Sequence, residues 1–248
     1  MQNEDLIYGY HVCLEYIRSK SDSINKVLIQ NNKVRKYREI INRLREEGIR
    51  YDIREKGELD KITKGGNHQG ILIYTSPIVY SDAYELISSE VEAPVFLLLD
   101  RIEDPQNLGS IIRTAAAAGV DGIIMEKRKC SQLTSTVVKV SSGGLAKVKI
   151  ARVSNIKNII EKLKEKSIPV VATIASGEWL WTEVDYRNGV AFILGNENTG
   201  VRKIIAEKAD YRVRIPLSNQ MDSLNVAVAC GIILYEAVRQ KMMKPAIK

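Results

Sequence analysis

The chain has 248 residues, of which 45% are hydrophobic and 27% charged, and its formal net charge is +7. This composition is ordinary for a globular protein, and the positive balance is compatible with a nucleic-acid partner or with solubility alone. No apolar run approaches the roughly 20 residues of a membrane helix, and the acidic start lacks the apolar core of a secretory signal. The three cysteines are far apart and form no C-x-x-C pair. We therefore expect reduced thiols in a cytoplasmic protein, without a disulfide framework or a zinc site.

Residues 1–76 predict a small α/β domain with a charged helix in its middle. Apolar side chains recur at helical spacing in 5–20 and again in 33–47, where Gly48 ends the pattern. Strands are predicted at three short apolar runs, 27–29, 51–53 and 70–74. A helical turn is predicted at 59–64. Residues 77–93, with their serines and acids, are predicted to be a linker that contains a helical piece.

The remaining residues, 94–248, alternate strand-like and helix-like patterns. Continuous apolar runs between helical patterns favour a mostly parallel sheet with helices on both faces, so we expect an α/β fold. The predicted strands are 95–100, 122–125, 148–153, 170–174, 190–194 and 213–215. The predicted helices are 108–118, 132–140, 155–166, 200–208 and 222–240. Ligands of such sheets bind where strands lead into helices, so polar residues at these junctions are the candidates for function.

The first polar junction follows the strand predicted at 95–100. Asp104 and Pro105 begin a turn, and Asn107 is placed to cap the helix that follows. Arg113 lies about one and a half turns farther on, near enough for its side chain to reach the junction. A plain cap for Asn107 and a solvated charge for Arg113 are the simpler interpretations of each residue alone.

The second junction is a glycine-containing loop after the strand predicted at 190–194. Gly195 and Gly200 have the G-x-x-x-x-G spacing, but Val201 follows in place of Lys, so this is not a phosphate-binding P-loop. No G-x-G-x-x-G is present either, which disfavours an NAD-type oxidoreductase. Gly195 would let a ligand approach the backbone closely. Glu197 is either an acid in the first turn of a helix or a carboxylate of the site.

The third junction is a polar loop that Pro216 separates from a short apolar strand. Ser223 and Asn225 stand before the last helical pattern, where one of them is explained as a helix cap. A cap does not account for both residues together with Asn219. The two histidines of the chain both lie in the first domain, so neither a Ser–His–Asp triad nor a histidine metal site is expected here.

Together the three junctions resemble the SpoU, or TrmH-like, family of RNA ribose 2′-O-methyltransferases. Residues 107–115 resemble the family pattern N-x-G-x-x-x-R-[ST]-A, residues 194–197 resemble L-G-x-E, and residues 215–226 resemble I-P followed by S-L-N-V. In the first domain, residues 7–18 and 68–71 resemble the ribosomal-protein-like substrate-binding domain of that family.

Two departures from the family pattern concern the loops. The family often has Gly-x where this chain has Asn198-Thr199, and often has Gly where it has Asn219. Asn adopts left-handed backbone conformations more readily than most residues, so we expect the loop that contains Asn219 to keep its shape.

The resemblance implies a fold, a cofactor and site residues. It implies that the C-terminal segment threads a loop to form a trefoil knot, an exception to the usual rule, and that S-adenosyl-methionine binds there. Arg113 is the implied catalytic residue, as the base for the ribose hydroxyl or as the group that positions an RNA phosphate. The residues implied to orient the reactants are Asn107, Glu197, Ser223 and Asn225. Those implied to hold the cofactor are Leu194, Gly195, Ile215, Pro216 and Leu224.

The resemblance also implies partners. Family members are usually homodimers through the knotted domain, and the apolar segment 227–238 would supply that surface. The two-domain architecture resembles the RlmB-type branch, which methylates a guanosine of large-subunit (23S) rRNA. Alternatives are an rRNA enzyme of the antibiotic-resistance type, a tRNA 2′-O-methyltransferase, or a non-catalytic RNA-binding module of ribosome assembly. The basic cluster at 33–38 either contacts RNA phosphates or is a solvated helix face.

Overall fold

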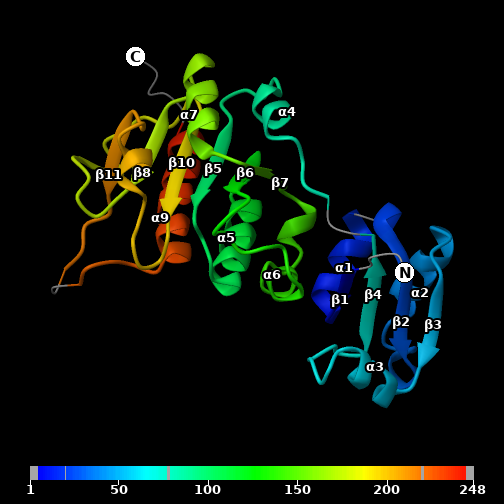
Figure 1. The fold of residues 1–248 in the computed structure, drawn as a ribbon. Helices are drawn as coiled ribbons and strands as arrows, with labels where there is room; N and C mark the ends of the chain where they lie inside the picture. Colours follow the sequence, from blue (N-terminus) through cyan, green and yellow to red (C-terminus); the bar gives the residue numbers. More distant parts are fainter. Residues whose placement is uncertain (1–4, 20, 77–78, 219–220, 244–248) are drawn as a thin grey trace. The chain divides into compact units, whose positions relative to one another are not determined.

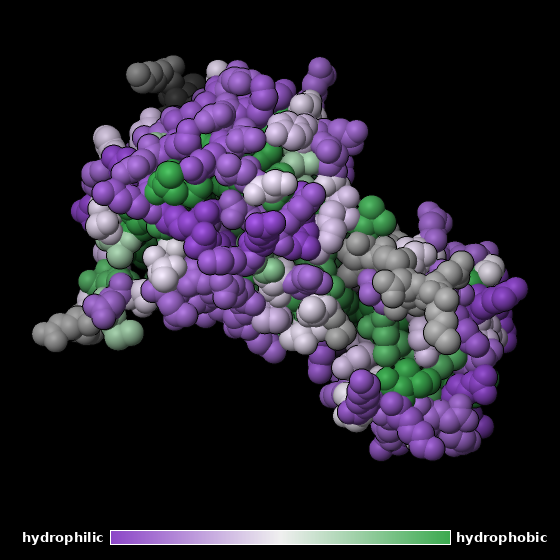
Figure 2. All heavy atoms as spheres, viewed as in Figure 1, coloured by the Kyte–Doolittle hydropathy of each residue, from purple (hydrophilic) through white to green (hydrophobic). Residues whose placement is uncertain are grey.

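The computed structural model of the chain describes residues 5–19, 21–76, 79–218 and 221–243 (Figure 1). By their contacts the residues form two compact units. The first unit comprises residues 1–79 and 133–147, and the second comprises 80–132 and 148–248. No helix in the described ranges is both long and apolar enough to cross a membrane. On the face that Figure 2 shows, hydrophilic side chains predominate and apolar ones form scattered patches.

The first unit contains a four-stranded sheet in the order β1-β4-β2-β3. β4 pairs antiparallel with both of its neighbours, whereas β2 and β3 are parallel. Its strands are β1 (Asp5–Tyr8), β2 (Ile24–Gln30), β3 (Tyr51–Arg54) and β4 (Ile71–Thr75). Its helices are α1 (Tyr10–Ser19), α2 (Arg38–Glu46), α3 (Lys56–Ile62) and α6 (Ser135–Val140), the last packed on β1.

The helix predicted for 5–20 is wrong at its start. Residues 5–8 form β1, paired with β4 from Asp5 opposite Thr75 to Tyr8 opposite Leu72. Gly9 then adopts a φ of +105°, a conformation that glycine adopts readily, and the helix begins only at Tyr10. The paired residues of the two strands are 64 to 70 positions apart in the chain, so local helical spacing did not reveal the pairing.

The second unit is built on a seven-stranded sheet in the order β7-β6-β5-β10-β8-β11-β9. Every pairing between these strands is parallel, which confirms the predicted α/β fold. The strands are β5 (Val95–Asp100), β6 (Gly122–Glu126), β7 (Lys149–Val153), β8 (Val170–Thr173), β9 (Trp179–Leu180), β10 (Val190–Gly195) and β11 (Tyr211–Arg214). The two-residue β9 was not predicted, and β11 begins and ends earlier than the predicted 213–215.

Helices cover both faces of this sheet, as Figure 1 shows. α4 (Ala83–Ser88), α7 (Ile156–Glu165) and α8 (Lys203–Ala206) pack their buried side chains into one apolar cluster with alternate strand residues such as Phe96 and Leu98. α5 (Pro105–Ala117) and α9 (Val226–Met242) pack against each other, and α9 also contacts β10. The segment 77–93, predicted as a linker, thus contributes α4 to the core of the second unit.

Two helix starts place side chains for the site. Asp104, not Asn107, caps α5: its carboxylate accepts a hydrogen bond from the Gln106 amide, and Pro105 occupies the first turn. The predicted cap role of Asn107 is therefore wrong, and its side chain is available for contacts between loops. Asn225 does cap α9, because its Oδ1 accepts hydrogen bonds from the amides of Ala227 and Val228.

Candidate active site

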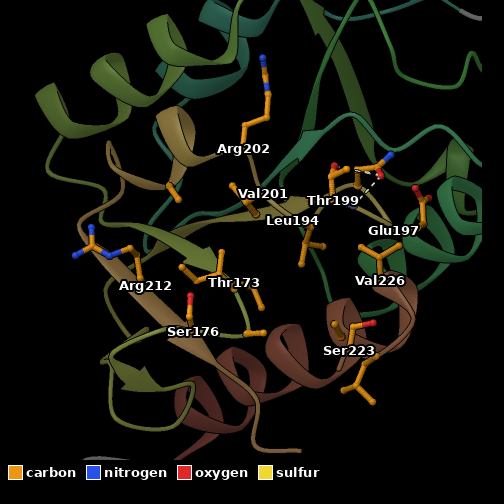
Figure 3. Close-up of a pocket in the computed structure, with 18 of the residues that line it drawn as sticks. Thr173, Ser176, Leu194, Glu197, Thr199, Val201, Arg202, Arg212, Ser223 and Val226 are labelled. Carbon is orange, nitrogen blue, oxygen red and sulfur yellow. Dashed lines mark hydrogen bonds between the residues drawn. The ribbon is translucent and has the colours of Figure 1, made fainter. Parts of the chain in front are cut away.

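Four strand ends converge on one cavity in the second unit. β5, β10, β8 and β11 are neighbours and parallel, so the segments that follow them emerge at the same edge of the sheet. There they line a cavity of about 1000 Å³, together with the start of α9 (Figure 3). This volume is at the upper end of the range of ordinary small-molecule sites.

A chain of side-chain hydrogen bonds connects the three polar junctions. The Asn107 Nδ2 donates to Glu197 Oε1 over 3.0 Å, and the Asn225 Nδ2 donates to Asn107 Oδ1 over 2.9 Å. Asn107 is thus both donor and acceptor, which fixes the orientation of its amide. Because Asn225 also caps α9, this series of hydrogen bonds connects the start of α9 to α5 and to the loop after β10.

The loop after β10 has a rigid, closed shape. Asn196 and Gly200 exchange two backbone hydrogen bonds of 3.1 and 2.8 Å. The Asn196 Oδ1 accepts hydrogen bonds from the amides of Asn198 and Thr199, while its Nδ2 donates to the Arg101 carbonyl. A Cβ on Gly195 would overlap the backbone of Gly200, so only glycine fits at the base of this loop. The loop thereby presents Glu197 toward α5.

A buried ion-pair cluster anchors the end of the same loop. Asp100, at the end of β5, is fully buried, and its carboxylate accepts from the Arg202 amide at 2.9 Å and from Arg202 Nε at 2.7 Å. The Arg202 guanidinium also donates to Glu126 Oε1 over 2.8 Å, at the end of β6. Figure 3 shows Arg202 pointing away from Leu194, and its contacts with Asp100 and Glu126 hold the loop in place.

The guanidinium of Arg202 stays protonated in this cluster. Partial burial lowers the pKa of the Arg202 guanidinium, but hydrogen bonds to Asp100 and Glu126 outweigh it and raise that pKa above its ordinary value. The arginine is therefore protonated throughout the physiological range, and it stabilises the carboxylate of Asp100 that would otherwise be an isolated buried charge.

Comparison with known proteins identifies the family. A family model described as SpoU rRNA Methylase family matches residues 94–235, and one described as RNA 2′-O ribose methyltransferase substrate binding matches residues 6–81. The chain belongs to the SpoU rRNA methylase family. It is therefore an RNA methyltransferase by family, as the resemblance of its three junctions predicted.

Two relatives of the SpoU family match along nearly the whole chain, and a third matches part of it. A putative TrmH family tRNA/rRNA methyltransferase of Bacillus subtilis is 32% identical over 243 residues, which cover 97% of each chain. An AdoMet-bound rRNA methyltransferase from Sinorhizobium meliloti has a TM-score of 0.80 and 28% identity, covering 97% of this chain and 88% of the other. A TrmH/SpoU tRNA modifying enzyme of A. aeolicus, 31% identical with a TM-score of 0.55, covers 64% of this chain and 82% of its own.

The structure brings most of the residues predicted from the SpoU resemblance to one place. Six of them line the cavity: Leu194, Gly195, Glu197, Ile215, Ser223 and Leu224. Asn107 and Asn225 do not line it but are hydrogen-bonded to Glu197 directly or in series. Arg113 and Pro216 are exposed and lie outside the lining, and Asn219 lies outside the described residues. The catalytic and cofactor-binding roles of these residues stay predictions.

Several residues of the site were not predicted from the sequence. The segment after β8 lines the cavity, and its Thr173 carries a buried hydroxyl with no hydrogen-bond partner. Asp100, Glu126 and Arg202 were also missed, although acids that end apolar strand runs were a visible signal. No cluster of His, Cys, Asp and Glu in the described part of the chain is arranged to hold a metal ion. Burial raises the pKa of the Cys230 thiol, so it is not a thiolate nucleophile at neutral pH.

Proposed function

We propose that this chain methylates a ribose 2′-hydroxyl of RNA with S-adenosyl-methionine as the methyl donor. The observation that carries the proposal is the hydrogen-bonded series Glu197–Asn107–Asn225, which joins three family motifs at the edge of one cavity. Methyl transfer to a hydroxyl requires the reacting oxygen to be held in line with the donor. A fixed polar series beside a cavity is suited to that task.

The residues of the cavity fit the cofactor. Leu194, Ile215 and Leu224 give it apolar walls for an adenine ring, and the unpartnered Thr173 hydroxyl offers a hydrogen bond to a ligand. Carboxylates in the lining, Glu197 and Asp222, suit a positively charged sulfonium. When bound, the cofactor supplies a methyl group activated by its sulfonium sulfur.

Arg113 is the residue of this chain that we assign to the RNA hydroxyl. It is exposed on α5, six positions after Asn107, so it is accessible to an RNA chain. Arginine is effectively always protonated, so positioning of the neighbouring phosphate by its fork of donors is the more economical role. Ser223, in the lining beside Leu224, would then contact the ribose or the methionine end of the cofactor.

We propose large-subunit (23S) rRNA, at a guanosine, as the substrate. The support is the first unit, because residues 6–81 match a substrate-binding family model and the tRNA-modifying relative covers only 64% of this chain. Ribose methylation should be mapped in rRNA and tRNA from cells with and without this protein. Loss of one rRNA guanosine methylation is the expected result, while an altered tRNA pattern with unchanged rRNA would contradict the substrate assignment.

A test with purified components separates the enzyme from a non-catalytic RNA-binding module. Calorimetry should detect binding of S-adenosyl-methionine, and tritium from its methyl group should appear in large-subunit rRNA. RNA binding without measurable cofactor binding would favour the module of ribosome assembly and contradict the proposed activity.

We also propose that the C-terminal segment threads a loop to form a trefoil knot. The support is the path of the chain after β11: α9 packs against α5 and contacts β10, although β8 separates β10 from β11 in the sheet. The chain therefore returns across the strand ends that line the cavity. A crystal structure in which the backbone is not knotted would contradict this proposal.

The exposed face of α9 is the surface that we assign to a homodimer. Val228, Tyr235 and Met242 recur every seven residues, so they lie on one face of the helix, and they are 53%, 52% and 79% exposed. Apolar stripes of this kind mark interaction surfaces.

Replacing Tyr235 by Glu is expected to convert a dimer to monomers, because an unpaired carboxylate would be buried at the interface. The dimer dissociation constant should rise by roughly 100-fold or more, since such burial costs several kcal/mol. Light scattering after size exclusion measures the mass, and Lys203→Glu, on the 92% exposed side chain of α8, is the control. A wild-type monomer, or a Tyr235→Glu dimer as tight as the wild type, would refute the interface.

A further inference from the structure

Arg101 has an unusual backbone conformation beside the cavity. It directly follows β5 and lines the cavity. Its backbone φ of +63° lies in the left-handed region, which residues with long side chains adopt rarely. The hydrogen bond from Asn196 Nδ2 to its carbonyl, 2.9 Å long, holds the backbone there. Strain of this kind persists where the surroundings enforce it, and it is concentrated at functional sites.

The side chain of Arg101 is also electrostatically unlike its neighbours. Four cations line the cavity: Arg101, Arg202, Lys203 and Arg212. Arg202 is paired with Asp100 and Glu126, Lys203 with Glu207, and Arg212 with Glu178. Across the described residues, Arg101 alone of the four has no ion pair.

A buried donor of Arg101 lacks an acceptor as well. Its Nε is inaccessible to solvent and has no hydrogen-bond partner. An unmet donor on a charged group costs free energy, and a bound reactant is one kind of group that satisfies it. The guanidinium fork matches the two oxygens of a carboxylate or a phosphate.

We infer that Arg101 is the anion-binding residue of this cavity and receives an oxyanion of a bound reactant. The inference rests on the proposed function, because that function brings two such groups to the cavity. One is the carboxylate at the methionine end of S-adenosyl-methionine, and the other is a phosphate of the RNA. In either case Arg101 binds and orients a reactant, a role separate from that of Arg113.

The Arg101→Asn variant tests this inference, because Asn accepts a positive φ more readily than Arg and should preserve the backbone at this position. Calorimetry compares S-adenosyl-methionine with 5′-methylthioadenosine, which keeps the adenosine and sulfur but lacks the carboxylate. If the anion is the carboxylate, affinity for S-adenosyl-methionine falls roughly 10- to 100-fold and that for methylthioadenosine is unchanged. If it is a phosphate, cofactor affinity is unchanged, KM for RNA rises, and the salt slope of RNA binding decreases by about one.

Arg187→Gln is the matched control, because it removes an exposed cation that Asp185 neutralises outside the cavity lining. It should leave the affinities for both ligands near those of the wild type. The inference is overturned if Arg101→Asn binds cofactor and RNA as the wild type does. It is also overturned if both adenosine ligands weaken equally with a lower melting temperature, which would indicate a structural role. Failure of the wild type itself to bind S-adenosyl-methionine would instead contradict the proposed function.

Discussion

Replacement of Arg113 by alanine is expected to abolish methyl transfer while cofactor binding stays close to that of the wild type. Arg113 is exposed on α5 and does not line the cavity, so its loss leaves the cofactor walls intact. Its part in the reaction is to act on the ribose hydroxyl or on the phosphate beside it. Groups of this kind contribute roughly 10²- to 10⁴-fold to rate, and a loss in that range is expected.

Arg113→Lys distinguishes the two roles of the arginine. Lysine keeps the positive charge but loses the planar fork, so phosphate positioning should be retained in part, with a raised KM for RNA. If Arg113 is the base, the rate of the lysine variant should instead depend on pH near the titration of the lysine amine.

Methyl incorporation into rRNA and calorimetry with S-adenosyl-methionine are the two measurements for the Arg113 variants. Arg187→Ala is the control: Arg187 is exposed and pairs with Asp185, outside the cavity lining. Turnover of Arg113→Ala near the wild-type rate would remove this residue from the mechanism. A parallel loss of cofactor binding would show that Arg113 helps to shape the cavity, although it is not part of the lining.

Most strands of the second unit were predictable, because buried strands contain continuous apolar runs, whereas the two-residue β9 was missed. In β5, Val95–Asp100, all six residues are buried, and the predicted bounds agree with the structure. Such runs occur in parallel sheets covered on both faces, which is why the fold class followed from pattern alone. The apolar pattern failed where a strand depends on a partner far away in the sequence. The residues of β1 were predicted to be helical because the partner strand, β4, is distant in the chain.

Motifs located the candidate site, but not the contacts within it. Asn107 was read as a cap because a short polar residue after Asp-Pro is typical of one. Only the structure shows that Asp104 takes that role and that Asn107 reaches Glu197, 90 residues away in sequence. The partner of the buried Asp100 is likewise 102 residues away, so no local spacing could have paired it with Arg202.

The Asp100–Arg202 pair should be the largest stability determinant of the site. Replacing Arg202 by alanine leaves a fully buried carboxylate without its partner, a change that costs about 3–5 kcal/mol of unfolding free energy in buried pairs. We expect the lower end, roughly 3 kcal/mol, because the Arg202 side chain is 24% exposed and partly screened. Urea unfolding measures this loss, and Arg212→Ala, which breaks an exposed pair with Glu178, should change stability little.

The same substitution should weaken cofactor binding, because Arg202 anchors the loop that contains Gly195 and Glu197. A loop that must be ordered on binding reduces affinity, whereas one held in place beforehand does not. Calorimetry well below the unfolding transition isolates this effect from global stability. Unchanged cofactor affinity in a folded Arg202→Ala protein would show that the Asn196–Gly200 hydrogen bonds alone hold the loop.

A double-mutant cycle with Asp100→Asn decides whether the pair acts as one unit. Because the buried charge is the source of the cost, removing it should relieve much of the penalty of Arg202→Ala. The double variant is therefore expected to be no less stable than Arg202→Ala alone, with a coupling energy of roughly 1–3 kcal/mol. Additive losses would mean that Arg202 stabilises the loop mainly through Glu126, which receives the other hydrogen bond of the guanidinium.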